Sequence, residues 1–345
     1  MAEVTLRSLK KNRTILHEVL PVDTPLLFGI FVGDICNFKC KYCIQSAEND
    51  VPEKKLLVRQ FLEWETFIKI ADSAKKFPQR IKTVLFSSIG EPLLHPQLPD
   101  MIKYLNDINL ADAYEIVTNA SLLTPELGER LLDAGLTRLC ISLQGLTEEK
   151  YKEICGVEIN YAEFYDNIKA FYESSRGKCK LHIKTVDIAL DSGEEEQFMD
   201  MYAPICDTIY IDKVVPAFKG IDYHDIVLDT EHYTEKSYRE NEKVCCSKIF
   251  YTLYTLADGR IAPCCDHPQP MTYGHIDNMD LVEAWNSDRR KKFLIQHLKH
   301  RRCENGICKQ CASPLEREFE EDILDGYEEE ILDRIHRSCE GTEQL

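Results

Sequence analysis

The chain has 345 residues, 44% of them hydrophobic, and a formal net charge of −17 at pH 7. This length suggests about two domains, and the sequence has neither an apolar run of 18 residues nor the apolar segment of a signal peptide. The acidic charge excludes a nucleic-acid partner held by a basic surface. We therefore expect a cytoplasmic protein with neither a nucleic-acid nor a membrane partner.

Fifteen cysteines are many for a chain without an export signal, where disulfides are rare and metal binding is the better interpretation. Most of them cluster, at 36/40/43, 245/246, 264/265 and 303/308/311. The scattered ones are expected to be small buried hydrophobic residues without a role in chemistry. They are Cys140, Cys155, Cys179, Cys206 and Cys339.

The first predicted strand, 28–32, leads into the segment Cys36-Asn-Phe-Lys-Cys40-Lys-Tyr-Cys43. Three thiolates with this C-x3-C-x2-C spacing can hold three irons of a four-iron cluster, and the next cysteine, Cys140, is far along the chain. Electron-transfer clusters use four cysteines, so the fourth iron here is left open for a small molecule to bind and react. The alternative is a zinc knuckle or a set of buried structural thiols.

Apolar, β-prone runs alternate with amphipathic segments through the first 215 residues. The expected strands are 28–32, 83–87, 114–118, 138–142, 181–186 and 208–211. Helical stripes between them comprise Phe61, Phe67, Ile70 and Ala71, then Met101, Leu105 and Ile108, then Leu127, Leu131 and Leu132. Six βα units predict a parallel sheet with crossover helices, and six are fewer than the eight of a closed barrel. The expected fold is α/β, a partial (β/α)6 TIM-like barrel over residues 26–215.

Short polar residues follow three of these strands. Strand two runs into Ile89-Gly-Glu91, where the glycine permits a close backbone approach. Glu91 places a carboxylate at the C-terminal edge of the sheet, where barrels of parallel strands build active sites. Asn119 and Ser142 lie at the ends of the next two strands. The alternative for all of them is a turn or a strand-end cap.

Residues 216–244 are polar and charged and predict a linker, after which a small cysteine-rich β-hairpin/helix domain is expected at 245–312. Asp258-Gly259 between two β-prone runs predicts a hairpin. It brings Cys246 and Cys264 onto neighbouring strands, and a terminal C-x2-C, Cys308 and Cys311, completes four thiolates. Such a set leaves no open iron, and a structural zinc ion is the alternative occupant. Cys245, Cys265 and Cys303 remain competing ligands.

The tail, 313–345, is acidic and carries an apolar stripe at helical spacing. The stripe consists of Ile323, Leu324, Ile331, Leu332 and Ile335. A capping helix is therefore expected at the C-terminus.

Together these motifs resemble the radical S-adenosylmethionine (SAM) enzymes, whose loop carries an aromatic residue before the last cysteine, as Tyr42 does here. The module at 245–312 resembles the SPASM extension of that family. The resemblance covers residues 26 to 312 and leaves 1–25 as an N-terminal extension. It implies the same partial barrel, SAM as cofactor and two 4Fe-4S clusters, one that binds SAM and one auxiliary cluster for electron transfer or structure.

The resemblance also implies roles for single residues. The open iron held by Cys36, Cys40 and Cys43 chelates the amino and carboxylate groups of SAM, and Glu91 accepts a hydrogen bond from its ammonium group. Tyr42, Gly90, Asn119 and Ser142 complete the SAM site. Two positions depart from the family: Ile89 replaces a glycine, and Gln144-Gly145 stands where relatives often have Asp-Gly, so that Gln144 receives no role.

The implied reaction is reductive cleavage of SAM to methionine and a 5′-deoxyadenosyl radical, which abstracts a hydrogen atom from an unactivated carbon. An external one-electron reductant such as flavodoxin or ferredoxin is implied. Oxidation or epimerisation of a small-molecule or sugar-like substrate is expected, because about 25 residues before strand one are too few for a peptide-binding domain to fold. Epimerisation or crosslinking of a ribosomal peptide is the alternative, and a non-catalytic iron–sulfur or zinc protein is the second. Cys245 is a candidate hydrogen donor to the substrate radical, or else a spare ligand beside Cys246.

Overall fold

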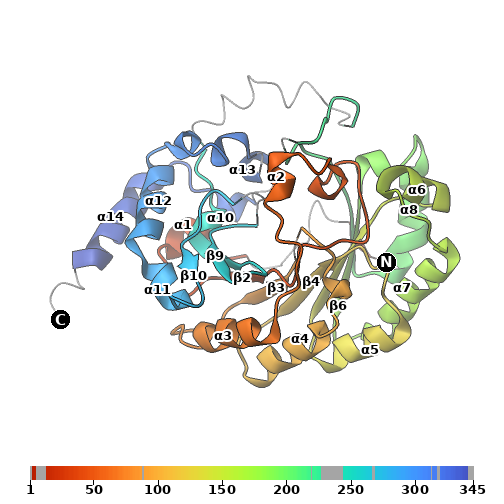
Figure 1. The fold of residues 1–345 in the computed structure, drawn as a ribbon, viewed down its shortest axis with the longest axis horizontal. Coiled ribbons are helices and arrows are strands. Elements are labelled where there is room, and N and C mark those ends of the chain that lie inside the picture. Colours follow the sequence, from red (N-terminus) through yellow and green to blue (C-terminus); the bar gives the residue numbers. More distant parts are fainter. Residues whose placement is uncertain are drawn as a thin grey trace.

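The computed structural model describes residues 2–4, 13–87, 89–218, 220–226, 244–265, 269–311, 313–316 and 319–340. Within these residues one curved sheet runs in the order β1-β7-β6-β5-β4-β3-β2-β8-β9-β10 (Figure 1). Its strands are β1 (Glu3–Val4), β2 (Leu27–Ile30), β3 (Thr83–Phe86), β4 (Tyr114–Thr118), β5 (Arg138–Leu143), β6 (Lys180–Val186), β7 (Thr208–Asp212), β8 (Thr252–Thr255), β9 (Arg260–Ala262) and β10 (Gly274–His275).

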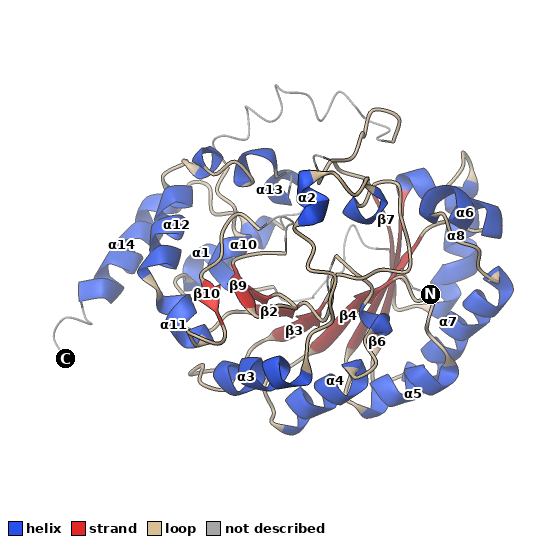
Figure 2. Ribbon diagram, viewed as in Figure 1, coloured by secondary structure: helices blue, strands red, loops and turns tan. Residues whose placement is uncertain are grey.

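The strands from β2 to β7 are the six expected ones, and each pairs in parallel with the next along the chain. The sheet keeps two separate edges, at β1 and β10, so the barrel is open as predicted. Helices cover its outer face (Figure 2). They are α3 (Trp64–Ala74), α4 (Leu98–Asp107), α5 (Pro125–Asp133), α6 (Glu148–Cys155), α7 (Tyr161–Ser175) and α8 (Glu194–Tyr202).

The apolar stripes pack against the sheet largely as their spacing predicts, since Phe67, Ile70, Met101 and Leu131 have no exposed surface. The assignment of Phe61 to the first stripe is wrong. Phe61 precedes α3 and forms an isolated antiparallel bridge with Gly33. Spacing alone assigns Phe61 to the helix, but its backbone pairs with Gly33 instead.

The cysteine-rich module continues the barrel sheet instead of forming a separate one. β8 pairs in parallel with β2, and β9 and β10 extend the sheet in antiparallel fashion. The helices of this part are α10 (Lys248–Tyr251), α11 (Leu281–Asn286), α12 (Asp288–Leu298), α13 (Ser313–Glu316) and α14 (Glu328–Glu340). The predicted division at 215 and 245 stays a prediction, because most of the expected linker lies outside the described residues.

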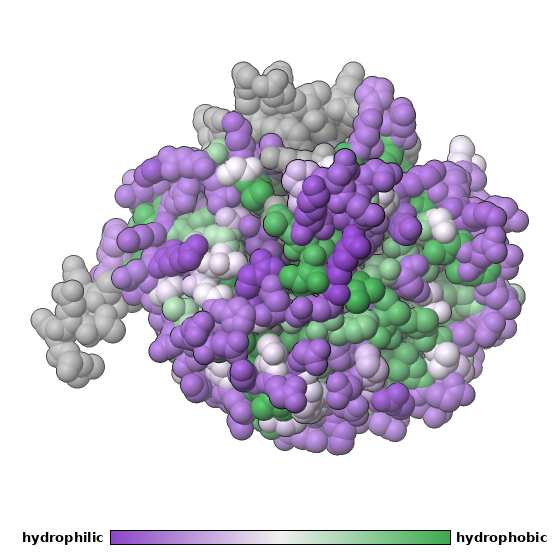
Figure 3. Space-filling view, viewed as in Figure 1, coloured by the Kyte–Doolittle hydropathy of each residue, from purple (hydrophilic) through white to green (hydrophobic). Residues whose placement is uncertain are grey.

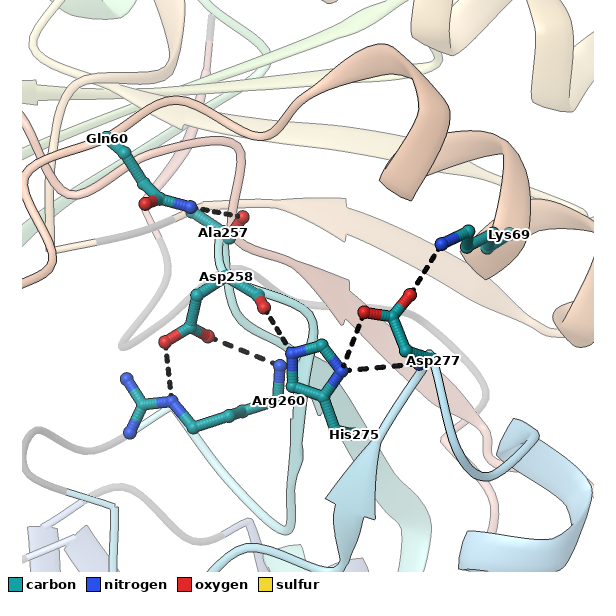
Figure 4. A network of polar contacts seen from close by, with 7 residues as sticks. All are labelled: Gln60, Lys69, Ala257, Asp258, Arg260, His275 and Asp277. Atoms are coloured by element: carbon teal, nitrogen blue, oxygen red, sulfur yellow. Dashed lines mark hydrogen bonds and ion pairs between the residues drawn. The ribbon is translucent and has the colours of Figure 1, made fainter.

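A polar network fixes the predicted hairpin turn to the barrel (Figure 4). Its centre is His275, whose Nε2 lies 2.6 Å from the carbonyl oxygen of Asp258 and whose Nδ1 accepts from the backbone N–H of Asp277 at 3.2 Å. Nδ1 also lies 3.5 Å from Oδ2 of Asp277. From the barrel, Lys69 pairs with Asp277 at 2.5 Å, and Gln60 donates to the carbonyl of Ala257 at 3.2 Å.

Residues near both ends of the chain form one apolar cluster together with residues of the cysteine-rich module. We call it the C-terminal core; its buried members are Leu16, Leu20, Cys245, Cys246, Ile249, Phe250, Phe293, Leu294, Leu298, Cys308, Leu324, Ile331 and Ile335. Its N-terminal part comes from α1 (Leu16–Val19), and α14 covers it as the expected capping helix. Arg334 of α14 donates to the carbonyl of Glu18 at 2.9 Å. No helix among the described residues is long and apolar enough to cross a membrane.

Candidate active site

The three-cysteine loop starts where β2 ends, and polar contacts hold its base. Asp34 accepts from the backbone N–H groups of Val58 at 2.5 Å and Gln60 at 3.1 Å. The side-chain amide of Gln45 donates to the carbonyls of Asp34 and Ile89, at 2.9 and 3.1 Å. Gln45 therefore links the cysteine loop to the loop after β3. Ile89, which replaces a glycine of the family, takes part in this link through its backbone carbonyl.

The pKa values of the thiols in this loop are raised. Burial raises the pKa of Cys36 to about 12, and the neighbouring Glu91, Cys40 and Cys43 add to the rise. Burial likewise raises the pKa of Cys43 to about 12. Iron binds the thiolate form of cysteine, so cluster assembly here must release protons.

The spacing of these thiols is wider than one zinc ion requires. Among the described residues, one group of at least three metal-ligating side chains has all its ligand atoms within 4.8 Å of one another: His300, Asp325 and Glu328. A tetrahedral zinc site, with Zn–S bonds of about 2.3 Å, places its sulfurs about 3.8 Å apart. A cluster of several irons fits the loop better than a single ion.

The end of α6 supports the cysteine loop from below. The backbone N–H groups of Lys39 and Lys41 donate to the carbonyls of Cys155 and Ile154, at 3.0 and 2.9 Å. The ring of Phe38 packs edge-on against Tyr151 of the same helix, with centroids 6.0 Å apart. The loop and helix are thus joined by backbone bonds as well as by packing.

Tyr42 is hydrogen-bonded to Gln144, the residue to which the family resemblance gives no role. Its hydroxyl donates to Oε1 of Gln144 at 2.6 Å, and Gln144 is buried. An uncharged amide satisfies the buried hydroxyl without placing a carboxylate beside the cysteine loop. This explains how the chain accommodates its departure from the family at this position.

Gly90 and Glu91 lie directly against the start of the loop. A Cβ on Gly90 would lie 2.4 Å from the carbonyl oxygen of Ile35, so only glycine fits this approach. The N–H of Glu91 donates to that same oxygen at 2.8 Å. The Glu91 carboxylate is 4% exposed and accepts from the N–H groups of Leu93 and Asn119, at 2.9 and 2.7 Å, and from the Thr118 hydroxyl.

These contacts show that Glu91 joins the ends of β3 and β4 whatever else it binds. Burial raises its pKa, and the hydrogen bonds from Asn119, Thr118 and Leu93 oppose the rise. With three donors placed on its two oxygens, the carboxylate keeps acceptor capacity for one more donor.

Asn119 reaches the cysteine loop, whereas Ser142 lies further round the barrel. The Asn119 amide donates to Oδ1 of Asn37 at 3.0 Å, and Asn37 donates to the Ser121 hydroxyl at 2.8 Å. Ser142 lies in β5, where it pairs with Lys184 of β6. Asn119 therefore lies beside the three cysteines, and Ser142 faces a different part of the interior.

The inner face of the barrel is polar at its C-terminal end. Ser142, Lys184 and Tyr210 lie in register on β5, β6 and β7. Their strand neighbours Ile141, Leu143, Ile183 and Ile209 are buried. Because side chains alternate along a strand and helices cover the outer face, the polar set lies on the inner face.

A charged pair completes this set, which we call the lumen cluster: Ser142, Lys184, Tyr210 and Asp212. Lys184 Nζ lies 3.6 Å from Asp212 Oδ2, with the two side chains 28% and 17% exposed. The Tyr210 hydroxyl donates to Asp212 Oδ1 at 3.1 Å. Charged residues at alternate positions inside predicted strands are the signal of this cluster in the sequence.

Two buried titratable side chains lie deeper in the barrel. Burial lowers the pKa of His182 to about 3, and Arg138 and Lys184 add to the effect. Its Nδ1 lies 2.7 Å from the Thr208 hydroxyl oxygen. Burial also raises the pKa of Cys140 to about 11. Both groups are uncharged at neutral pH, whereas Arg138 and Glu115, at the N-terminal ends of their strands, form an ion pair at 3.5 Å.

The cysteines of the C-terminal module divide between two environments. Cys264 and Cys308 both lie near Tyr273, whose pKa is raised first by burial, with a contribution from both thiols. Cys265 packs with the separate apolar group of Phe31 and Tyr254. Cys264 also contributes to the raised pKa of Tyr254, so it borders both groups and shares Tyr273 with Cys308.

Cys245 and Cys246 both belong to the C-terminal core. Cys245 has no exposed surface, and its backbone N–H donates to Asp325 at 2.9 Å. Its suggested role as a hydrogen donor stays a prediction.

The barrel, the three-cysteine loop at its mouth and the cysteine-rich module define an iron–sulfur enzyme of the partial-barrel type. A family model described as the Radical SAM superfamily matches residues 30–203, and one described as an iron–sulfur cluster-binding domain matches residues 245–312. The chain therefore belongs to the radical SAM superfamily and carries a SPASM domain. Its cofactors are accordingly SAM, a 4Fe-4S cluster and an auxiliary iron–sulfur cluster.

Two curated relatives illustrate the range of the matches. The chain is 23% identical over 298 residues to the tungsten-containing aldehyde ferredoxin oxidoreductase cofactor-modifying protein of Pyrococcus furiosus, covering 74% of this chain and 79% of that protein. It is 34% identical over 131 residues to a GTP 3′,8-cyclase of a Sulfurovum species, covering 38% of this chain and 37% of the cyclase.

Solved structures share the fold. Native anSMEcpe with bound AdoMet has a TM-score of 0.60 at 13% identity, over 91% of this chain and 96% of that chain. Streptococcus suis SuiB bound to the precursor peptide SuiA has a TM-score of 0.56 at 17% identity, over 86% of this chain and 72% of that chain. At such identities the likeness concerns the fold alone.

Proposed function

We propose that this protein is a radical SAM oxidoreductase or isomerase that acts on a small polar molecule, with Cys36, Cys40 and Cys43 holding the SAM-binding cluster. Bound together, the cluster and SAM supply one-electron chemistry that abstracts a hydrogen atom from an unactivated carbon. Cys246, Cys264, Cys308 and Cys311 hold the auxiliary cluster, and an external reductant such as flavodoxin or ferredoxin delivers the electron.

The chain's own residues have separate tasks in this proposal. Gly90 lets the loop after β3 approach the cysteine loop, and Glu91 turns its remaining acceptor capacity toward the SAM ammonium group. Asn119 and Tyr42 border the same loop through their bonds to Asn37 and Gln144. These hydrogen bonds hold the site in one geometry before SAM enters.

The lumen cluster is the main observation in favour of a small polar substrate. A lysine, a carboxylate, a phenol and a hydroxyl at the barrel mouth offer both hydrogen-bond donors and acceptors within a small space. Such a set suits hydroxyl, amino or anionic groups of a compact ligand. The names of the curated relatives, a cofactor-modifying protein and a GTP cyclase, also refer to small molecules.

A peptide substrate is the second candidate. The surface of the face that carries α2 (Pro52–Lys55) supports it, because apolar residues gather near the centre of that face inside a hydrophilic periphery (Figure 3). SuiB, which shares the fold, carries a bound precursor peptide. An extended peptide would need such a surface outside the barrel, whereas a small molecule would not.

An anaerobic assay tests the proposal. Reconstituted protein, dithionite and SAM should yield 5′-deoxyadenosine, and the Cys36→Ala/Cys40→Ala/Cys43→Ala variant should yield none. A panel of amino sugars and nucleotides, GTP included, should contain compounds that raise this yield in wild type but less in Lys184→Met. No 5′-deoxyadenosine from a fully loaded protein would contradict the enzyme class, and stimulation by peptides alone would contradict the substrate class.

A further inference from the structure

Cys155 lies in contact with one of the three loop cysteines, whereas its isolated place in the sequence predicts a buried thiol without a role. It is the last residue of α6 and has no exposed surface. Its Sγ lies 3.7 Å from Sγ of Cys40, across 115 positions in the chain. The sequence-based assignment of Cys155 as a thiol with no role is therefore open to revision.

The backbone fixes this contact from both sides. The carbonyls of Ile154 and Cys155 accept from Lys41 and Lys39, the residues on either side of Cys40. The helix ends immediately afterwards at Gly156, whose φ of +66° suits a left-handed cap. The fold thus holds the backbones of Cys40 and Cys155 side by side.

Which of the two sulfurs, that of Cys40 or that of Cys155, donates the hydrogen bond depends on which of them binds iron. A cysteine bound to iron is a thiolate, which has no proton and can only accept a hydrogen bond. If Cys40 binds iron as proposed above, the thiol hydrogen can come only from Cys155. Hydrogen bonds to the sulfurs of an iron–sulfur cluster are among the factors that set its reduction potential.

We propose that Cys155 is a positioning residue of the SAM-binding cluster, whose thiol donates to the Cys40 sulfur and makes the cluster easier to reduce. A donor at a ligand sulfur stabilises the reduced state more than the oxidised state, because reduction adds negative charge to the cluster and its ligands. Cys155 thereby favours the electron transfer on which SAM cleavage depends. This inference rests on the proposed ligand set.

The test uses the anaerobically loaded, full-length protein and four single variants. Cys155→Ala and Cys155→Val remove the donor, Cys155→Ser replaces it by a hydroxyl, and Cys206→Ala removes a buried thiol at another place in the fold. Iron content and the electron paramagnetic resonance signal of the reduced cluster are followed through a redox titration. The signal is assigned by its absence from the Cys36→Ala/Cys40→Ala/Cys43→Ala variant.

We expect unchanged iron in all four variants. At the potential where the wild-type cluster is half reduced, the ratio of reduced to oxidised cluster should fall about two- to tenfold in Cys155→Ala and Cys155→Val, the range of one hydrogen bond. A tenfold fall corresponds to about 59 mV for one electron. Cys155→Ser should recover part of the loss, and Cys206→Ala should match wild type.

A wild-type titration in both apolar variants would overturn the proposal. Loss of about four irons in those variants would overturn it differently, by making Cys155 a ligand. If one apolar variant does not fold, the other is compared with Cys155→Ser. Retention of all iron in the triple-cysteine variant would instead refute the ligand set, so the two failures are distinguishable.

Discussion

At the scale of single residues, the approach of two loops defines the candidate site. The backbone of Ile35 lies so close to Gly90 that no side chain fits at position 90. Glu91 follows, and its carboxylate is buried among three hydrogen-bond donors. The role proposed for Glu91 therefore depends on Gly90, because only a glycine lets the two loops approach this closely.

Gly90→Ala should damage both stability and SAM binding. The added Cβ must push the two loops apart, which we expect to lower the free energy of unfolding by about 1–3 kcal/mol. Gly306→Ala is the matched control, because a Cβ there meets nothing within 4 Å. Anaerobic thermal unfolding and calorimetry with SAM measure both effects. Equal behaviour of the two variants would remove the close approach from the account.

Glu91→Gln should weaken SAM binding while both clusters stay intact. Loss of one charge-assisted hydrogen bond costs on the order of 1.5–3 kcal/mol, or roughly 10- to 150-fold in affinity. Thr118→Val removes one protein donor to the carboxylate but keeps its charge, and so controls for the structural part of the effect. If calorimetry finds the same SAM affinity for Glu91→Gln as for wild type, Glu91 does not belong to the site.

The hydrogen-donor role predicts a separate behaviour for Cys245. Cys245→Ala should then keep full iron and SAM cleavage but stall turnover, and product formed by wild type in D2O should carry deuterium. Normal turnover of the variant, or unlabelled product, would dismiss the role. Loss of half the iron would make Cys245 a ligand in place of Cys246.

The sequence predicts those site residues whose signal is local. Cys36, Cys40, Cys43 and Glu91 stand in short motifs, so spacing alone marks them. Gln144 and Cys155 act through partners more than 100 positions away, at Tyr42 and Cys40. A single sequence carries no signal for such pairs, because their proximity follows from how the end of β5 and the end of α6 pack against the loop.

At the scale of elements, the six barrel strands were predictable because each is a β-branched or apolar run between helical stripes. β1 and the pairing of β8 with β2 were not predictable. β1 is two residues long, and the β2–β8 pair joins segments more than 200 positions apart. The apolar stripe of the tail predicted α14 and its buried face, but Ile323 lies outside that face and is 42% exposed.

The capping helix gives a prediction at this scale. Ile331 of α14 is fully buried in the C-terminal core, which also contains Cys246 and Cys308. Ile331→Ala should lower the free energy of unfolding by about 2–5 kcal/mol through the cavity that it leaves. Ile323→Ala is the matched control and should change it by less than about 0.5 kcal/mol. Denaturant unfolding compares the two, and equal losses would contradict the capping role.

At the scale of the whole molecule, the shared sheet sets the two cysteine groups apart. Cys36 follows the C-terminal end of β2, whereas Cys246 precedes the N-terminal end of the neighbouring parallel strand β8. The groups thus lie toward opposite ends of adjacent strands, which rise about 13 Å over four residues at about 3.3 Å each. Two separate clusters fit this arrangement, one at each end of the strand pair.

Iron and sulfide analysis of the anaerobically reconstituted protein tests the central claim most directly. Two four-iron clusters predict about eight iron and eight sulfide per chain. Replacing Cys36, Cys40 and Cys43 together by Ala should leave about four of each, in the auxiliary cluster. A wild-type protein that takes up only four iron, or that holds stoichiometric zinc, would contradict the two-cluster account.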